Sequence, residues 1–378
     1  MSEVFRTDFA GREIFLRTHY LAGQADGAVM VRYGDTVVLV TAVSLKSKRE
    51  GVDFLPLTVD YEEKTFAAGK IPGGFFKREG RPNEREILIS RIIDRSVRPL
   101  FPKGYYHETQ IVAILLSVDN ENDSDVAAML GCSAALTISD IPFKGPVAGV
   151  RVGRVKGQFV ANPSAKMLEE SDLDLFLTGR KVPRADGTFD VNPVMLEGGA
   201  QEVGEDVIIE AVEFGLDALR PVLELQDRMC VAVGRQKRSV EEVSYDGELA
   251  RKLADLAEKD LAAAYRIPSK LERYTKLDEA RAAALNAVTA ENPAGEQAAR
   301  GVLDQLERKI LREMILNEGT RIDGRSAADI RPISCEAGLL PRTHGSALFT
   351  RGETQALAVL TLGTASDEQR MDYISGEE

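Results

Sequence analysis

Two segments near opposite ends of the 378-residue chain share one pattern. Residues 27–39, GAVMVRYGDTVVL, align without a gap on residues 345–357, GSALFTRGETQAL, so that the glycines, the acidic residue, the threonine and the last leucine coincide. In both segments a glycine and an acidic residue separate two strand-forming runs, which is typical of a β-hairpin with a two-residue turn. Two unrelated hairpins that share only G-[DE]-T are the alternative. We favour a duplicated domain, because a single register aligns all of these positions.

The residues between the two copies divide the chain further. A chain of 378 residues exceeds what one hydrophobic core usually fills. Residues 1–235 mix strand and helix patterns and predict an α+β domain. Residues 240–318 are rich in Ala, Glu, Lys, Leu and Arg with helical periodicity, and predict an all-helical domain. Residues 322–378 return to strand patterns and predict the beginning of a second copy, which would be incomplete.

Individual elements follow from periodicity and from turn residues. The predicted strands are 13–17, 28–33, 36–42, 54–61, 110–118, 148–154 and 173–178. The predicted helices are 83–98, 126–139, 205–219, 248–264, 270–288 and 293–316. The helix 126–139 contains many Ala, Gly and Ser residues, so we expect it to pack closely against its neighbours.

Composition limits the classes of function. The net charge of −12 argues against a surface that coats nucleic acid, although residues 77–103 carry eight basic and only four acidic side chains. An odd number of cysteines without C-x-x-C spacing indicates free thiols in a reducing compartment: Cys132, Cys230 and Cys335. The three histidines lack metal-ligand spacing, and we predict no metal site in this chain. Without a long apolar run or a signal-peptide core, we expect a cytoplasmic protein without a membrane partner.

The segment from Gly73 to Pro102 joins a basic aromatic tip to a helix. The glycines at 73 and 74 permit a tight turn at no steric cost. They are followed by two adjacent aromatic rings and a group of cations: Phe75, Phe76, Lys77, Arg78 and Arg81. In a loop both rings can stack on bases while the cations contact the sugar–phosphate backbone. This tip is therefore predicted to bind RNA.

The helix that follows has a defined beginning and end. Asn83 and Glu86 have the spacing of a capping box, and Pro99 is expected to end the helix at Arg98. At about 100° per residue, one arc is apolar and another carries a stripe of three arginines. The apolar residues are Leu88, Ile89, Ile92 and Ile93, and the stripe is Arg91, Arg95 and Arg98.

The arginine stripe has three readings. It is an ordinary helix surface neutralised by Glu84, Glu86 and Asp94, it is a site for an anion, or the spacing is accidental. Like charges four residues apart repel one another unless a partner is present. The basic aromatic tip beside it favours the anion site.

Four stretches together resemble a known family: FLPLTV at 54–59, AAGKIPGGFFKREGRP at 67–82, RIIDRSVRPLFP at 91–102 and LPRTHGSALFTRGETQ at 340–355. The chain resembles the N-terminal part of the bacterial polynucleotide phosphorylases over most of its length. The likeness is weakest at residues 180–199, which look like a local departure or insertion. The resemblance implies a ribonuclease-PH-like βαβα core, a helical domain and the start of a second ribonuclease-PH-like domain. No P-loop is present, which argues against a nucleotide-dependent kinase or ATPase.

The resemblance also implies an activity. Members of the family remove nucleoside diphosphates reversibly from the 3′ end of single-stranded RNA, with inorganic phosphate as co-substrate and Mg²⁺ as cofactor. They are homotrimeric rings with a central pore, and degradation-assembly proteins are possible partners. By this resemblance, Phe75, Phe76, Lys77 and Arg78 match the pore loop, whose usual motif is FFRR, and Arg91, Arg95 and Arg98 match arginines of the phosphate and RNA pocket.

By the same resemblance, the residues that bind metal and phosphate are expected beyond residue 378. In the first copy, Ser124–Asp125 stands where the family has a phosphate-binding serine pair, and a carboxylate there would repel phosphate. Asp174-Leu175-Phe176 stands where the family has Asp-x-Lys, so the lysine is absent. A metal pair of Asp172 and Asp174 is the alternative to two solvated carboxylates. The first copy is therefore expected to be inactive, and a non-catalytic scaffold that binds RNA and forms rings is the second hypothesis for this chain.

Overall fold

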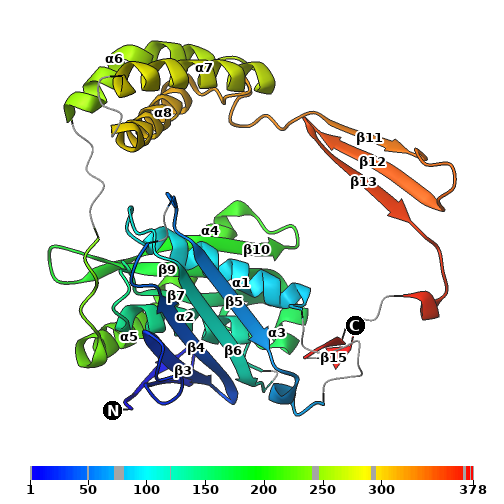
Figure 1. The fold of residues 1–378 in the computed structure, drawn as a ribbon. Coiled ribbons are helices and arrows are strands. Elements are labelled where there is room, and N and C mark those ends of the chain that lie inside the picture. Colours follow the sequence, from blue (N-terminus) through cyan, green and yellow to red (C-terminus); the bar gives the residue numbers. More distant parts are fainter. Residues whose placement is uncertain are drawn as a thin grey trace. The chain divides into compact units, whose positions relative to one another are not determined.

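The computed structural model describes residues 2–48, 51–71, 81–119, 121–240, 247–290, 295–368, 372–374 and 376–377. The chain forms two compact units, residues 1–242 together with 370–378, and residues 243–369. Helices and strands occur in both units (Figure 1), which confirms the predicted α+β class.

The first unit begins with a six-stranded sheet. Its strand order is β1-β2-β3-β4-β6-β5, and its neighbours are antiparallel except for β5 and β6. The strands are β1 (Val4–Phe9), β2 (Arg12–Thr18), β3 (Gly27–Tyr33), β4 (Thr36–Ser44), β5 (Leu57–Glu63) and β6 (Thr109–Ser117). Helix α1 (Glu84–Val97) lies in the connection from β5 to β6, because parallel neighbours need a crossover.

A four-stranded antiparallel sheet of order β10-β9-β7-β8 follows in the same unit. Its strands are β7 (Val147–Val155), β8 (Gln158–Ala161), β9 (Ser171–Pro183) and β10 (Phe189–Ala200), and the helices around it are α3 (Ala165–Glu169), α4 (Glu205–Ala218) and α5 (Arg220–Val233). Residues 180–199, the weakest stretch of the resemblance, form most of the hairpin of β9 and β10, whose register shifts between Pro193 and Met195.

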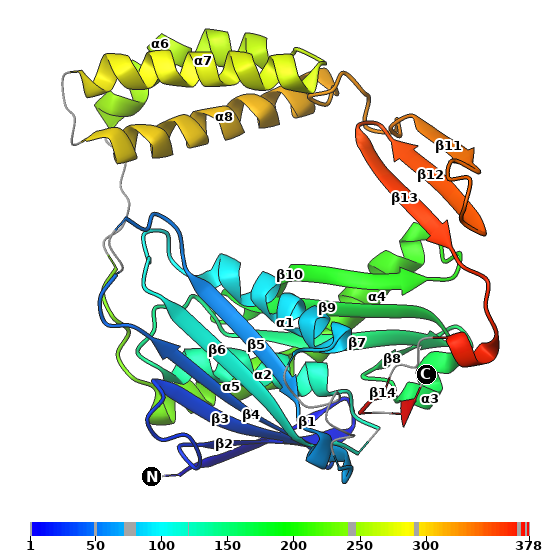
Figure 2. The same ribbon diagram turned by 45° about the vertical axis from the view of Figure 1, so that its right-hand side comes forward.

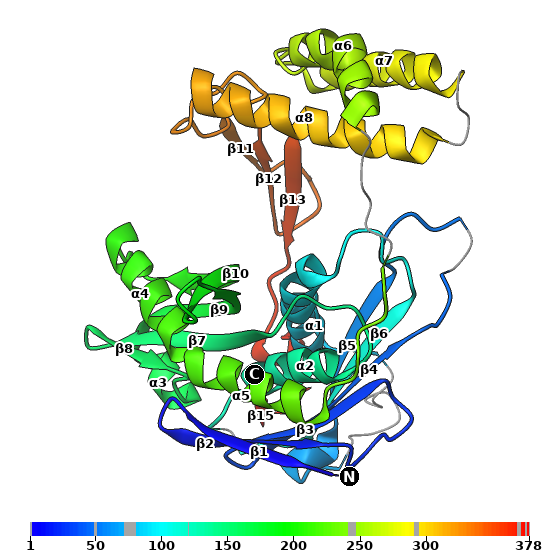
Figure 3. The ribbon, with the colours of Figure 1, turned by 90° about the vertical axis from the view of Figure 1, so that its left-hand side faces the viewer.

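Helix α2 (Ser124–Ile138) connects the two sheets (Figure 3), and all of its residues are buried. It packs against β3, β4 and β6 of the first sheet and against β7 of the second. A Cβ on Gly131 would lie 2.5 Å from Val40 Cγ2, and a Cβ on Gly27 of β3 would lie 2.1 Å from the Ala135 carbonyl oxygen. The expectation that small residues allow this helix to pack closely is confirmed.

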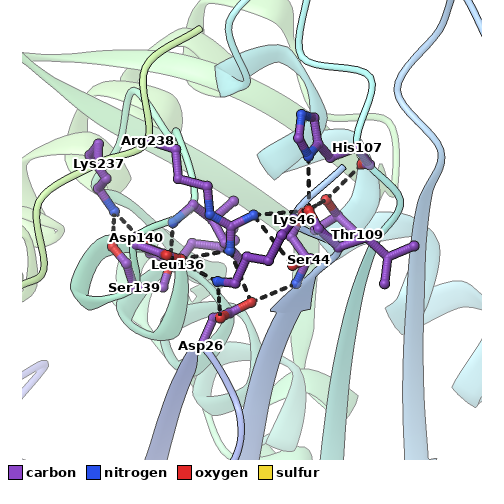
Figure 4. Close-up of polar contacts among 12 residues, drawn as sticks. Asp26, Ser44, Lys46, His107, Thr109, Leu136, Ser139, Asp140, Lys237 and Arg238 are labelled. Carbon is purple, nitrogen blue, oxygen red and sulfur yellow. Dashed lines mark hydrogen bonds and ion pairs between the residues drawn. The ribbon is translucent and has the colours of Figure 1, made fainter. Parts of the chain in front are cut away.

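The C-terminal end of α2 anchors residues 234–240, which follow α5 (Figure 4). The Lys237 ammonium donates to three carbonyl oxygens at 2.7, 2.9 and 2.8 Å, those of Leu136, Thr137 and Ser139. These carbonyls belong to the last turn of the helix and to the residue after it, where carbonyls lack partners within the helix. A cation also interacts favourably with the negative end of the helix dipole.

The next residue extends this anchor to the first sheet. Arg238 forms ion pairs with Asp26 at 3.2 Å and with Asp140 at 2.7 Å, and Lys46 pairs with the same two carboxylates at 2.9 and 3.1 Å (Figure 4). Hydrogen bonds from the Arg238 and Lys46 side chains hold the pKa of Asp140 low, at about 2. Two cations and two carboxylates thus hold the chain against the first sheet before it leaves this unit.

The second unit contains three helices around one apolar core (Figure 2). They are α6 (Gly247–Ala264), α7 (Lys270–Thr289) and α8 (Glu296–Glu318). A three-stranded antiparallel sheet follows, made of β11 (Ile333–Ala337), β12 (Gly345–Arg351) and β13 (Thr354–Leu360). The short strands β14 (Asp372–Tyr373) and β15 (Gly376–Glu377), which belong to the first unit, pair with each other.

The hairpin β12–β13 has the same register as the hairpin β3–β4. The pairs that close the two turns are Tyr33–Thr36 and Arg351–Thr354. Gly34 and Gly352 each have φ of 60°, a left-handed conformation that glycine adopts without strain. The repeat in the sequence is therefore also a repeat in the backbone, which confirms both predicted hairpins.

Several boundaries and several elements differ from the sequence prediction. Strand β5 begins at Leu57 rather than Phe54, after Pro56, which has no amide hydrogen to donate to a sheet. Strands β1, β8, β10 and β11 and helices α3 and α5 were not predicted as separate elements. The short β1 pairs only with β2, and α5 begins directly after α4, with Leu219 capping both helices.

We expect Gly131→Ala to lower the free energy of unfolding by about 1–3 kcal/mol, because an added methyl group overpacks a filled core. The new Cβ would lie 2.5 Å from Val40 and 2.9 Å from Val31. Urea unfolding followed by circular dichroism measures the change. Gly23→Ala is the control, since a Cβ there meets no atom within 4 Å. Equal unfolding midpoints for the two variants would contradict this account of the packing of α2.

Candidate functional site

Helix α1 carries the predicted arginine stripe and begins and ends as the sequence predicts. The Asn83 side chain accepts a hydrogen bond from the Glu86 amide at 2.9 Å, and the Glu86 carboxylate accepts one from the Asn83 amide at 2.6 Å. This is the predicted capping box. The helix ends at Val97 with Arg98 as its C-cap, and Pro99 follows in a short 3-10 turn.

The basic aromatic tip lies mostly outside the described residues. This holds for Phe75, Phe76, Lys77 and Arg78. Arg81 is described and is exposed to solvent. The RNA contacts expected of these residues stay a prediction.

Arg98 is held by four hydrogen bonds. Its Nε and Nη2 donate to the two carboxylate oxygens of Asp94 at 2.9 and 2.6 Å. Its guanidinium also donates to the carbonyl oxygens of Leu55 and Leu57 at 3.2 and 3.1 Å. Asp94 therefore neutralises part of the stripe, as the first reading of the sequence expected, and Arg98 ties the end of α1 to the start of β5.

The other two arginines differ from Arg98 and from each other. Arg95 forms an ion pair with Glu197 of β10, rather than with the acidic residues of its own helix that the sequence suggested. Arg91 is exposed and has no ion pair or hydrogen bond to any residue that the structure describes. Arg98 is therefore fixed within the protein, Arg95 is paired with a residue of another element, and Arg91 is available to a ligand.

A cleft of about 520 Å³ lies beside α1. Apolar side chains of α1 line part of it together with Phe176 of β9. Its charged residues are four carboxylates and two guanidiniums: Glu84, Asp125, Asp174, Glu197, Arg85 and Arg151. The cleft thus has more negative than positive side chains.

Arg151 of β7 occupies the centre of these charges. Its Nη1 donates to both carboxylate oxygens of Asp174 at 2.7 and 2.8 Å, and its Nη2 binds Asp125. Asp123, the N-cap of α2, lies 3.4 Å from the same Nη2. The guanidinium carbon also lies 5.9 Å from the centre of the Phe176 ring. This single side chain therefore joins the N-terminal end of α2 to the second sheet.

The environment of Asp125 is unsuited to phosphate. Burial raises the pKa of this carboxyl to about 6, although the Arg151 guanidinium beside it favours the charged form. Above that pH Asp125 is an anion, and its best positioned cation is already shared among three carboxylates. An incoming phosphate would meet like charge rather than a free guanidinium.

The described residues of the cleft also do not fit a divalent cation. Asp174 is bound by Arg151, and Asp172 pairs with Arg154 at 3.1 Å, so the two carboxylates bind separate guanidiniums rather than one ion. Both carboxylates were expected to be solvated or to form a metal pair, and ion pairing is the outcome. Among the described residues, no group of three His, Cys, Asp or Glu side chains is arranged to hold a metal.

Two side chains that shape the site could not be found from local patterns. Glu197 lies 102 positions after Arg95, and Arg151 lies 26 positions after Asp125. Neither residue belongs to a motif. The one feature of the sequence that pointed to such partners was the arginine stripe itself, because three neighbouring cations on a helix require negatively charged groups nearby.

The three cysteines are free, as predicted, and Cys132 is buried in α2 while Cys230 and Cys335 are exposed. Within the part of the chain that the structure describes, no helix combines the length and the apolar character that a membrane span requires.

Comparisons with known proteins cover nearly the whole chain. The model described as 3′ exoribonuclease family, domain 1, matches residues 10–142 and also residues 329–377, and domain 2 of the same family matches residues 145–218. The model described as polyribonucleotide nucleotidyltransferase, RNA binding domain, matches residues 248–326. The double match of domain 1 confirms the duplication inferred from the two hairpins.

Curated relatives agree with these family matches. A polyribonucleotide nucleotidyltransferase from Syntrophus aciditrophicus is 62% identical over 100% of this chain and 54% of its own length. The proteins of the same name from Geobacter sulfurreducens and Pelobacter propionicus are 50% and 48% identical over 98% and 100% of this chain, and 52% of their own length in each case. Among solved structures, rice Rrp46 covers 62% of this chain at 16% identity with a TM-score of 0.43, a likeness too distant to contribute to the assignment.

The chain spans about half the length of the curated relatives it matches. Its matches extend from residue 10 to residue 377 and include both exoribonuclease domains and the polyribonucleotide nucleotidyltransferase RNA binding domain. We conclude that this chain belongs to the polyribonucleotide nucleotidyltransferase family.

Proposed function

We propose that this chain acts, within a protein of the length of its relatives, in the phosphate-dependent 3′ to 5′ degradation of single-stranded RNA. The reaction releases nucleoside diphosphates and is reversible. The observation that carries the proposal is the identity of 62% along the whole chain to a relative named polyribonucleotide nucleotidyltransferase. Turnover of mRNA is the physiological role that such an activity would serve.

Within that protein, this chain would contribute contacts to RNA. Arg91 and Arg95 are partly or fully available on α1, and the basic aromatic tip, including Arg81, precedes them in the sequence. Fixed cations suit phosphorolysis, because the reaction requires stabilised charge on phosphoryl oxygens more than covalent participation of the protein. Arg98 would act mainly by positioning the end of α1.

Mg²⁺ and the residues that bind it would come from elsewhere in the longer protein. When bound, the ion would neutralise charge on the reacting phosphate. Within this cleft, Asp125 and Asp174 are occupied by Arg151 and Glu197 pairs with Arg95, so we assign these carboxylates no role in binding the ion.

We also propose three domains, at residues 1–235, 240–318 and 322–378. The division of the structure near residue 242 and the family matches that begin at 248 and 329 support these limits. A homotrimer, partner proteins in an RNA-degrading assembly and a cytoplasmic location complete the proposal, and they rest on the resemblance to the family.

A second candidate, a non-catalytic scaffold that binds RNA and forms rings, is favoured by one observation. The first-copy cleft contains Asp125 and a guanidinium already shared by three carboxylates, so it lacks an obvious site for phosphate. The two candidates differ in whether catalysis is supplied by residues outside this chain.

We expect the 378-residue chain to bind single-stranded RNA without releasing nucleoside diphosphates. The measurement is product release from a 3′-labelled RNA, with and without inorganic phosphate and Mg²⁺, beside a binding assay on the same RNA. A full-length relative is the positive control. Phosphate-dependent turnover by this chain would show that its own cleft is active and that the role assigned to Asp125 is wrong.

Alanine substitutions at two positions of the stripe should have different effects, one on RNA affinity and the other on the stability of the fold. Arg91→Ala is expected to weaken RNA binding roughly tenfold without changing the melting temperature, because it removes a cation that pairs with no residue the structure describes. Arg98→Ala should instead lower stability by about 1 kcal/mol or more and change RNA affinity little, since it removes bonds within the protein. Fluorescence anisotropy and thermal unfolding measure the two effects. The same loss of affinity in both variants, without a change in stability, would contradict this division.

A further inference from the structure

The contact between Arg95 and Glu197 joins two elements at the cleft. Arg95 lies in the last turn of α1 and Glu197 lies on β10, where it faces Phe176 of β9 in the strand register. The two side chains are 48% and 44% exposed. An ion pair this exposed is weak, because water and salt screen it. It can therefore open without disturbing the fold.

The backbone at Glu197 is held firmly although the ion pair is weak. A Cβ on the next residue, Gly198, would lie 2.3 Å from the carbonyl oxygen of Asp174 and 2.8 Å from the Cα of Leu175. A side chain at position 198 would therefore clash with the backbone of β9, and the pairing of the two strands continues through Glu197 and Gly198. The Glu197 carboxylate can leave Arg95 by rotation of its side chain, while its backbone stays beside α1.

The partners of the three arginines give Arg95 a distinct position. Arg98 uses four of its five N–H donors on Asp94 and two carbonyl oxygens, and Arg91 has no partner among the described residues. Within the same part of the chain, Arg95 has a single partner, and that partner comes from another element. Whether Arg95 is available to an external anion therefore depends on one carboxylate.

We propose that Glu197 limits the affinity of this surface for RNA by competing with RNA phosphates for Arg95. The proposal rests on the proposed function, since it takes the external anion to be a phosphodiester of single-stranded RNA. When RNA binds, Arg95 exchanges the carboxylate for a phosphate oxygen. No net ion pair is gained, and the freed carboxylate stays close enough to repel the RNA. Glu197 thus favours rapid release of RNA over tight retention.

The charge-neutral variant Glu197→Gln tests this directly. The amide keeps the shape of the side chain but removes its charge, so Arg95 becomes free for RNA. We expect RNA to bind about two- to fivefold more tightly, the range that corresponds to an exposed ion pair. The slope of log affinity against log salt should become steeper by up to about 0.7, the value for one additional phosphate contact on a single strand.

The experiment uses fluorescence anisotropy of a labelled single-stranded oligoadenylate over a salt series, without phosphate or Mg²⁺. Four variants of the 378-residue chain are compared with the wild type: Glu197→Gln, Arg95→Ala, the double variant, and Glu210→Gln. The last makes the same change of net charge on an exposed position of α4. The gain in affinity should be absent in Glu210→Gln, and Glu197→Gln should give no gain when Arg95 is already alanine.

The outcomes separate this inference from the proposed function. If the wild type binds RNA and Glu197→Gln matches Glu210→Gln, the competition is refuted while the RNA-binding role stands. The competition is also refuted if Glu197→Gln binds RNA more weakly than the wild type, because Glu197 would then orient Arg95 for RNA. It is refuted as well if Glu197→Gln still increases RNA affinity when Arg95 is alanine. If none of the proteins binds RNA at low salt, the RNA-binding role assigned to this chain fails, and the competition fails with it.

Discussion

The burial of α2 on all sides is the constraint on which the first unit depends. A helix can contact strands of two sheets at once only if its residues are small where the strands come close, and Gly131 and Gly27 meet that condition. Because no part of α2 faces solvent, polar groups at its ends need partners within the protein. Lys237 supplies hydrogen-bond donors at the C-terminal end, and Arg151 pairs with carboxylates at the N-terminal end. The anchor of residues 234–240 and the charge cluster of the cleft are therefore consequences of one packing arrangement.

The electrostatics of the cleft and of the arginine stripe on α1 follow from how many partners each guanidinium has. Arg151 is divided among three carboxylates, Arg98 is fixed by Asp94 and backbone oxygens, Arg95 has one exposed partner, and Arg91 has none among the described residues. A fully shared cation stabilises the fold and has little capacity left for a ligand, whereas an unpaired one can bind an anion. Four arginines within one region therefore serve different purposes, although their side chains are chemically identical.

A large part of the fold could be predicted from the sequence, and the limits of that prediction are physical. The hairpin turns, the capping box at Asn83 and the end of α1 near Pro99 depend on interactions within a few residues. Strand β1 and helix α5 were missed because a short edge strand and a helix that begins where another ends lack strong local signals. Strand β10 was also missed, because a proline and two glycines interrupt its strand pattern. The candidate site was predicted less completely: the arginine stripe was found, but its partner Glu197 was sought on the same helix.

The sequence by itself determined the repeated hairpin, since its spacing and its glycines restrict the backbone to one turn and one register in both copies. It also determined the small-residue character of α2 and the arc on which the three arginines lie, because helical periodicity depends only on residue spacing. Only the tertiary structure decided which carboxylate meets which arginine. Arg95 finds Glu197 across 102 positions because α1 packs against β10, and Arg151 finds Asp125 because α2 joins the two sheets. Such pairings depend on distances between separate elements, and local sequence patterns do not encode those distances.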